Sequence, residues 1–223
     1  MAGHSLGEYT ALVCGDAIDF GDALSLVRFR GEAMQAAVPA GEGAMAAVLG
    51  LDAEQVEAAC LAAAEHEVVE PVNYNAPGQI VIAGDAAAVE RAVAEAKSLG
   101  ARRAVLLPVS APSHCSLMAG AARELAERLV ETEVRRPGLP VIHNVDAEVH
   151  SEPNEIRTAL TRQLHRPVQW TDCVDALRSF GATQVVEAGP AATIFDTPRT
   201  DYTKALMAAA FRLEAVAGGV VNE

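Results

Sequence analysis

Hydrophobic and polar positions at the start of the chain follow the period of amphipathic helices. Apolar residues recur at steps of three and four over residues 5–13 and over about 20–38, which predicts two helices. The apolar stripe of the second segment is formed by Leu24, Val27, Gly31 and Met34. Arg30 falls within this stripe. Because a charge on an apolar face is costly unless it is paired, we expect Arg30 to meet an anion there, either structural or brought by a ligand.

Between residues 43 and 109, short apolar runs alternate with helical segments. The runs predict strands at residues 43–50, 67–75, 79–84 and 102–109. Asp52 and Asp85 stand where helix N-caps are expected, and Gln55 follows Asp52 at the spacing of a capping box. The resulting order is β-α-β-β-α-β. We therefore predict a ferredoxin-like small subdomain over 43–109, inserted into a larger one.

The remaining chain alternates helical and strand-like segments as well. Helices are predicted over about 117–133, 155–164 and 171–181, and short strands over 140–145 and 183–190. This alternation indicates an α/β layer architecture, so residues 1–42 and 110–195 are expected to form a large, α/β-hydrolase-like catalytic subdomain. Residues 196–223 carry no recognisable motif and are treated as a divergent tail.

Composition excludes several classes of protein. The chain is 51% hydrophobic and 21% charged, as in soluble globular proteins, and its formal net charge of -13 argues against nucleic acid as a partner. No apolar run approaches the about 20 residues of a membrane span, and no signal peptide is evident, so a cytoplasmic protein without a membrane partner is expected. The four cysteines form no CxxC pair and the histidines show no metal spacing, which predicts free thiols and no metal site.

The stretch "GHSLG", residues 3–7, fits the G-x-S-x-G pattern of a nucleophile elbow. In such an elbow a tight turn exposes the serine oxygen, here that of Ser5, at the start of a helix. The backbone N–H of Leu6 would then face the oxyanion of a tetrahedral intermediate. Since the pattern also occurs by chance in loops, a catalytic reading requires a base.

His114, in "SAPSHCSLM", is the candidate base, because a serine needs a neighbouring imidazole to accept its proton. The alternative is a loop histidine that caps the helix after it. His4 adjoins the serine and is expected to shape the pocket, whereas His66 and His150 are expected to be exposed.

Seven segments carry a more specific resemblance: "GHSLGEYTAL", "LVRFRGEAMQ", "GAMAAVLGLD", "PVNYNAPGQIVIAG", "PVSAPSHCSLM", "VIHNVDA" and "LHRPVQWTDCV". In this order, from Gly3 to about Pro190, the chain resembles the malonyl-CoA:acyl carrier protein transacylases of bacterial fatty-acid synthesis. The resemblance implies Ser5 as the acylated nucleophile, His114 as general acid and base, and Arg30 as the clamp for the malonyl carboxylate.

The same resemblance implies further properties. The backbone carbonyl of Gln163 would orient His114; the alternative is an exposed helical glutamine. The substrates would be malonyl-CoA and the phosphopantetheine thiol of acyl carrier protein, with no cofactor and a monomeric protein. Two departures stand against the match. Only Met1 and Ala2 precede Gly3, and the "GQGSQ"-type loop that supplies a second oxyanion donor in the family is missing from the sequence, so an amino-terminally truncated chain is expected.

Three other functions stay open on the sequence. A polyketide synthase acyltransferase shares the elbow, the arginine and the histidine. An α/β-hydrolase that releases free acid to water shares the elbow, although it has little use for Arg30. A non-catalytic remnant is the third possibility, because the front segment of the family is missing.

Overall fold

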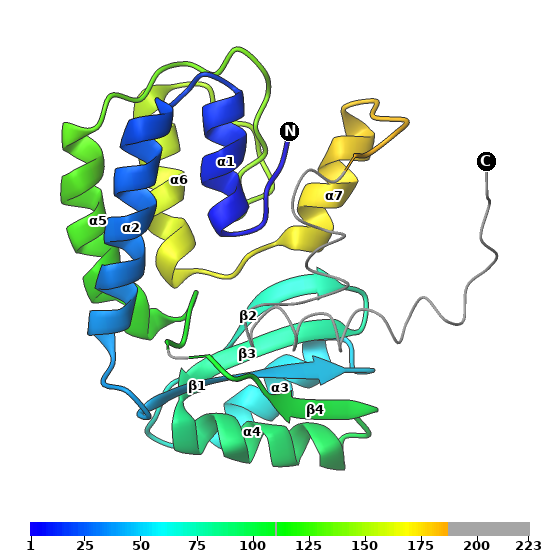
Figure 1. Ribbon diagram of the computed structural model, residues 1–223. Helices are drawn as coiled ribbons and strands as arrows, with labels where there is room; N and C mark the ends of the chain where they lie inside the picture. The colour runs from blue at the N-terminus through cyan, green and yellow to red at the C-terminus, as the bar shows by residue number, and fades with distance from the viewer. Residues whose placement is uncertain (110, 187–223) are drawn as a thin grey trace.

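The computed structural model describes residues 1–109 and 111–186, and it places a group of helices beside one four-stranded sheet (Figure 1). The helical part contains α1 (Leu6–Cys14), α2 (Phe20–Ala37), the 3-10 turn η1 (Ser116–Met118), α5 (Ala119–Glu131), α6 (Pro153–His165) and α7 (Trp170–Ser179). Between α2 and η1 come β1 (Gly43–Leu49), α3 (Ala53–Ala64), β2 (Val69–Ala76), β3 (Gln79–Asp85), α4 (Ala86–Ser98) and β4 (Arg103–Leu106). The mixed α/β fold class predicted from the sequence is confirmed.

The sheet has the strand order β2-β3-β1-β4, and every neighbouring pair is antiparallel. β1 and β3 pair along their full length, from Gly43 opposite Asp85 to Leu49 opposite Gln79. The register of β2 on β3 shifts after Pro71. Because proline cannot donate to a ladder, its place in an edge strand is the expected one.

The two faces of the sheet have different partners. α3 and α4 pack on one face, where Val48, Ile80 and Ile82 meet Val56 and Val89 in one apolar cluster. The other face presents Met45, Val72 and Val81 to Leu107 and Cys115. This second face looks toward the helical part of the chain (Figure 1). The sheet therefore forms one wall of the space in which the candidate site lies.

Both predicted N-cap residues, Asp52 and Asp85, precede helices, but only Asp52 makes the complete capping box. Asp52 accepts a hydrogen bond from the backbone N–H of Gln55 at 2.9 Å, and the Gln55 side chain accepts one from the backbone N–H of Asp52 at 3.1 Å. This is the predicted capping box of α3. Asp85 is the N-cap of α4 by backbone geometry, although its side chain accepts from Val68 instead.

The buried face of α2 differs from the predicted stripe. Its buried members are Ala23, Leu26, Arg30, Ala33 and Met34. Leu24 is 58% exposed and Gly31 is exposed, so the predicted stripe was wrong at these two positions, whereas Val27 packs partly buried against the core and Met34 is buried. Arg30 is on the buried face all the same, because it lies one turn before Met34 and one turn after Leu26.

One predicted strand is not a strand in the structure, and another is described only in part. Within residues 140–145, Ile142 makes one parallel bridge to Ala2 and one antiparallel bridge to Val149, and no ladder continues from either bridge among the described residues. A strand needs several consecutive residues that pair with a neighbouring strand, whereas here each neighbouring segment pairs with one residue only. Residues 183–186 are irregular, and the rest of the predicted strand 183–190, like the tail 196–223, lies outside the described residues.

Two further findings concern the whole described part of the chain. All four cysteines are free thiols, as predicted. None of the described helices combines the length and the apolar character that crossing a bilayer requires.

Candidate active site

Ser5 lies at the turn that opens α1, and its backbone is strained. It is the N-cap residue of the helix with φ 51° and ψ -104°, a conformation that residues other than glycine rarely adopt. The close approach of Gly3 to the helix explains one of the two motif glycines, because a Cβ on Gly3 would lie 2.0 Å from the carbonyl oxygen of Gly7. A Cβ on Gly7 itself would meet nothing within 4 Å. The tight turn therefore depends on Gly3.

His114 faces the serine from the loop before η1. Its Nε2 lies 2.8 Å from Oγ of Ser5, and its Nδ1 lies 2.7 Å from the backbone carbonyl oxygen of Gln163 on α6. Because a carbonyl can only accept, Nδ1 carries the proton and Nε2 is left to accept from the serine hydroxyl. This is the arrangement of a serine with its general base. Gln163 is fully buried, so the alternative of an exposed helical glutamine is wrong.

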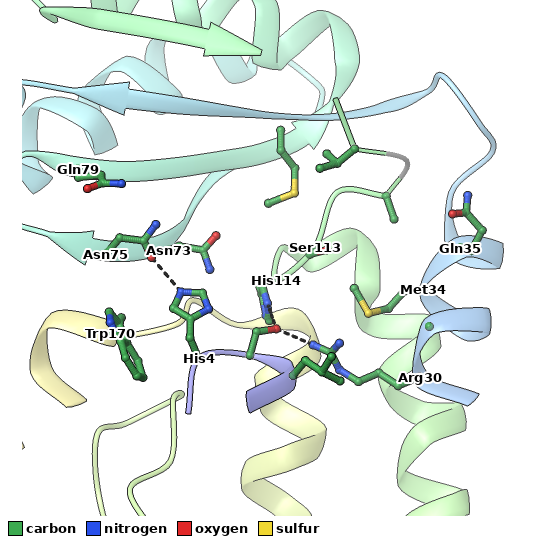
Figure 2. A pocket seen from close by; sticks show the side chains of 16 residues that line it. His4, Arg30, Met34, Gln35, Asn73, Asn75, Gln79, Ser113, His114 and Trp170 are labelled. Atoms are coloured by element: carbon green, nitrogen blue, oxygen red, sulfur yellow. Dashed lines mark hydrogen bonds between the residues drawn. The ribbon is translucent and has the colours of Figure 1, made fainter. Parts of the chain in front are cut away.

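Arg30 reaches the same serine oxygen from α2. Its Nη2 donates to Oγ of Ser5 at 2.9 Å and to the side-chain oxygen of Gln163 at 3.2 Å. The guanidinium also lies over the ring of Tyr9, with 5.8 Å between Cζ and the ring centroid. In Figure 2, the dashed lines from Arg30 and His114 meet on one hydroxyl oxygen. A positive charge here favours negative charge on the serine oxygen or on a ligand beside it.

The surroundings of His114 hold it in the neutral form. Burial lowers the pKa of His114 to about 3, and the nearby charge of Arg30 acts in the same direction. The hydrogen bond to the Gln163 carbonyl opposes both effects, because it stabilises the protonated ring. The imidazole is thus ready to accept a proton at neutral pH.

A cavity of about 770 Å³ opens above the serine, within the size range of small-molecule sites. It is lined from the helical part by His4, Ser5, Leu6, Arg30 and Met34, among others, and from the sheet by Met45, Asn73, Asn75 and Gln79. Ser5 therefore lies at the boundary between the two parts, and residues of both parts line the cavity (Figure 2).

His4 is held at the cavity wall. Its Nε2 lies 2.9 Å from Oδ1 of Asn75, and its ring meets Trp170 edge to face at 5.3 Å between centroids. Burial lowers the pKa of His4, which favours the neutral ring. His4 thus lines the predicted pocket. His66 is exposed as predicted, but His150 is half-buried because it contacts Asp146 at 3.2 Å and the ring of His143, so that prediction was wrong.

The buried polar residues that the sequence reasoning missed include Glu8, His143 and Asn144 near the elbow, and Asn73 and Gln79 at the cavity. Glu8 directly follows the elbow motif, and His143 and Asn144 lie in "VIHNVDA", so the segments were noticed while the roles were not. The sequence offered one indication that these residues are buried: they are polar residues within otherwise apolar segments. Among the residues described, no group of three His, Cys, Asp or Glu side chains is placed to hold a metal ion.

The α/β fold and the hydrogen-bonded pair of Ser5 and His114 have the arrangement that is typical of proteins with a serine nucleophile. The family model for the acyl transferase domain matches residues 1–217, and the chain belongs to that family. The resemblance predicted from the sequence is confirmed by relatives of known name.

The chain is similar to the malonyl CoA-acyl carrier protein transacylase of Escherichia coli (strain K12), with 54% identity over 190 residues, 85% of this chain and 62% of the relative. The enzyme of that name from Bacillus subtilis (strain 168) is 47% identical over 190 residues, 85% and 60% of the two chains. The chain thus spans about three fifths of the length of these curated relatives.

Solved structures agree in fold. An acyl carrier protein S-malonyltransferase from Vibrio cholerae matches with a TM-score of 0.84 at 51% identity, covering 92% of this chain and 64% of the other. A malonyl-transacylase in complex with a type II PKS acyl-carrier protein matches with a TM-score of 0.84 at 47% identity, covering 93% and 64%.

Proposed function

We propose that the chain transfers the malonyl group of malonyl-CoA to the phosphopantetheine thiol of acyl carrier protein, through a malonyl ester of Ser5. The observation that carries this proposal is the meeting of two groups on one oxygen: Nε2 of His114 at 2.8 Å and Nη2 of Arg30 at 2.9 Å from Oγ of Ser5. The names of the relatives support the same substrates.

Each half of the reaction exchanges one thioester or ester bond. Oγ of Ser5 attacks the thioester carbon while Nε2 of His114 takes the hydroxyl proton. The C–S bond then breaks, and the CoA sulfur leaves with the proton from His114. In the second half the carrier thiol gives its proton to His114 and attacks the ester carbon, and the serine hydroxyl is restored. The backbone N–H of Leu6, at the start of α1, would stabilise the oxyanion of both intermediates.

Arg30 accounts for the choice of a diacid. The free carboxylate of a malonyl group on Ser5 is separated from the ester carbonyl by a single CH₂ group, so it remains within reach of a guanidinium that contacts Oγ. A planar guanidinium binds a carboxylate through two parallel hydrogen bonds. Bound carboxylate would also offset the charge that helps to lower the pKa of His114, and would thereby raise the basicity of the imidazole in the complex.

The remaining predictions of the sequence belong to this proposal. The reaction needs no cofactor, and we place it in the cytoplasm, in fatty-acid synthesis, with a monomeric protein. His4 would shape the pocket next to the nucleophile. We also keep the division into a large catalytic subdomain (1–42 and 110–195) and a small ferredoxin-like one (43–109) as part of the proposal.

The test is acylation of the 223-residue chain with radiolabelled malonyl-CoA, followed by peptide mapping. We expect one label on Ser5, its loss in Ser5→Ala, and its transfer to the carrier thiol. Release of free malonate to water instead would support hydrolysis, and a folded chain that never acquires label would support a non-catalytic remnant. Arg30→Ala should lower malonyl loading far more than acetyl loading; equal losses on both would refute the clamp.

A polyketide carrier is the second candidate acceptor, because one of the similar solved structures is a complex with a type II PKS acyl-carrier protein. Chemistry at Ser5 would be the same for both carriers. Parallel transfer assays with a fatty-acid carrier and a polyketide carrier distinguish them, and we expect the higher kcat/KM with the fatty-acid carrier.

A further inference from the structure

Glu8 is a fully buried carboxylate one turn after the nucleophile, and the mechanism above does not use it. Three donors surround it. Oε1 accepts from Nδ1 of His143 at 2.7 Å, and Oε2 accepts from the backbone N–H of Asn144 at 2.9 Å and from Nε2 of Gln163 at 2.8 Å. A buried carboxylate is tolerated only with such compensation, and here two separate segments provide it: residues 143–144 and the helix α6, which carries Gln163.

The residues that contact Oε2 of Glu8 are the ones that hold the backbone of the elbow. Asn144 accepts from the N–H of Ser5 at 2.6 Å and donates to the carbonyl oxygen of Gly3 at 2.8 Å. The side chain of Gln163 donates to the carbonyl oxygen of Ser5 at 3.0 Å. The strained backbone of Ser5 is therefore hydrogen-bonded at its N–H and at its carbonyl by the side chains of two residues that Glu8 contacts.

Glu8 also determines which way the Gln163 amide faces. Because a carboxylate can only accept, the NH₂ group of Gln163 must face Glu8, and the amide oxygen must then face Arg30, as observed at 3.2 Å. The backbone carbonyl of the same residue holds His114. One acceptor oxygen on Glu8 is thus linked, through Gln163, to the two groups that converge on the serine oxygen, Arg30 and His114.

We propose that Glu8 is a positioning residue: its Oε2, through Gln163 and Asn144, holds Ser5, Arg30 and His114 in register for acyl transfer. The role is positional, and it depends on where the acceptor oxygen lies more than on its charge. This inference rests on the proposed function for its main assay. The alternative role for Glu8 is that of a charged partner for His143, which its Oε1 contacts.

Two substitutions separate these roles. Glu8→Gln is isosteric and keeps an acceptor oxygen for Asn144 and Gln163, while its NH₂ group can face His143 in the other tautomer. Glu8→Asp keeps the carboxylate but withdraws it by one C–C bond, so that it no longer reaches all its partners. If position matters, Glu8→Asp is the more damaging variant; if charge matters, Glu8→Gln is.

The measurement is the single-turnover rate of malonyl-Ser5 formation at saturating malonyl-CoA. We expect a loss of about a hundredfold in Glu8→Asp, the scale of a small misplacement of reacting groups. In Glu8→Gln we expect at most about tenfold, the scale of one altered hydrogen bond. The half-saturating malonyl-CoA concentration should rise by a smaller factor than the rate falls in Glu8→Asp, because Glu8 does not line the cavity and acts on bound malonyl-CoA only through Arg30. A loss in Glu8→Gln equal to or larger than that in Glu8→Asp overturns the proposal, as do wild-type rates in both.

Leu12→Ala is the matched control, since Leu12 is fully buried one turn further along α1 and does not touch the network. It should lower the free energy of unfolding and leave the acylation rate near wild type in the folded protein. If Glu8→Asp does not fold, Glu8→Gln decides alone: a loss above about tenfold overturns the positional role.

A second reagent separates failure of this inference from failure of the proposed function. An alkyl fluorophosphonate reacts at Ser5 without any malonyl group: the Oγ–P bond forms, the P–F bond breaks, fluoride leaves and His114 takes the proton. If the wild type reacts with it but not with malonyl-CoA, the malonyl assignment fails. The positioning role is then tested by the phosphonylation rates: it predicts that Glu8→Asp reacts more slowly than Glu8→Gln, and the opposite order overturns it.

Discussion

The pKa of His114 makes a quantitative prediction about stability. Burial and the charge of Arg30 lower it from the ordinary 6.5 to about 3 in the folded protein. Because the unfolded chain binds the proton first as the pH drops, the folded state loses stability from about pH 6.5 down toward pH 3. From pH 7.5 to 5.5 this single group should lower the free energy of unfolding by about 1.4 kcal/mol.

His114→Asn removes this titration and leaves the other ionisable groups, His4 included, in place. Urea unfolding of both proteins at pH 7.5 and 5.5 gives four free energies of unfolding. We expect the wild type to lose about 1.4 kcal/mol more than the variant over this interval, whatever the variant's own stability at pH 7.5. Equal losses in the two proteins would show that His114 titrates normally in the folded state, and would refute the description of the buried base.

The same pKa predicts the pH dependence of catalysis. Since kcat/KM reports the ionisation of the free enzyme, kcat/KM for malonyl loading should show no histidine limb between pH 5.5 and 7.5. A decline with a midpoint near 6.5 would indicate an ordinary imidazole at position 114 and contradict the reasoning from burial.

Two further predictions concern the elbow and a helix start. Gly3→Ala should abolish folding or Ser5 labelling, because the new Cβ would lie 2.0 Å from the Gly7 carbonyl oxygen. Gly7→Ala is the control, because its Cβ would meet nothing within 4 Å. Circular dichroism and thermal unfolding should show that Gly7→Ala keeps the folded state. Asp52→Ala should lower the free energy of unfolding by about 1 kcal/mol through loss of the capping box, with an unchanged acylation rate at Ser5, as measured by urea unfolding and malonyl labelling; unchanged stability would contradict the cap.

Features that depend on neighbouring residues in the chain could be predicted from the sequence alone. The capping box at Asp52, the β-α-β-β-α-β order and the elbow glycine at position 3 depend on residues near one another in the chain, so spacing was enough to predict them. The buried place of Arg30 was predicted as well, although the stripe around it was not, because alanines as well as large residues form the contact face of α2.

Tertiary structure alone decided how the site is held together. The hydrogen bonds of Glu8 to His143 and Gln163, and of Asn144 to Ser5, join residues more than a hundred positions apart, and no period or spacing in the sequence encodes such pairs. The segment 140–145 is a second case in which distant residues decide the structure. Its apolar pattern predicts a strand, but a strand forms only where a neighbouring strand pairs with several consecutive residues. Propensity and pattern act locally, whereas burial of polar groups is settled by which distant partners the fold brings to them.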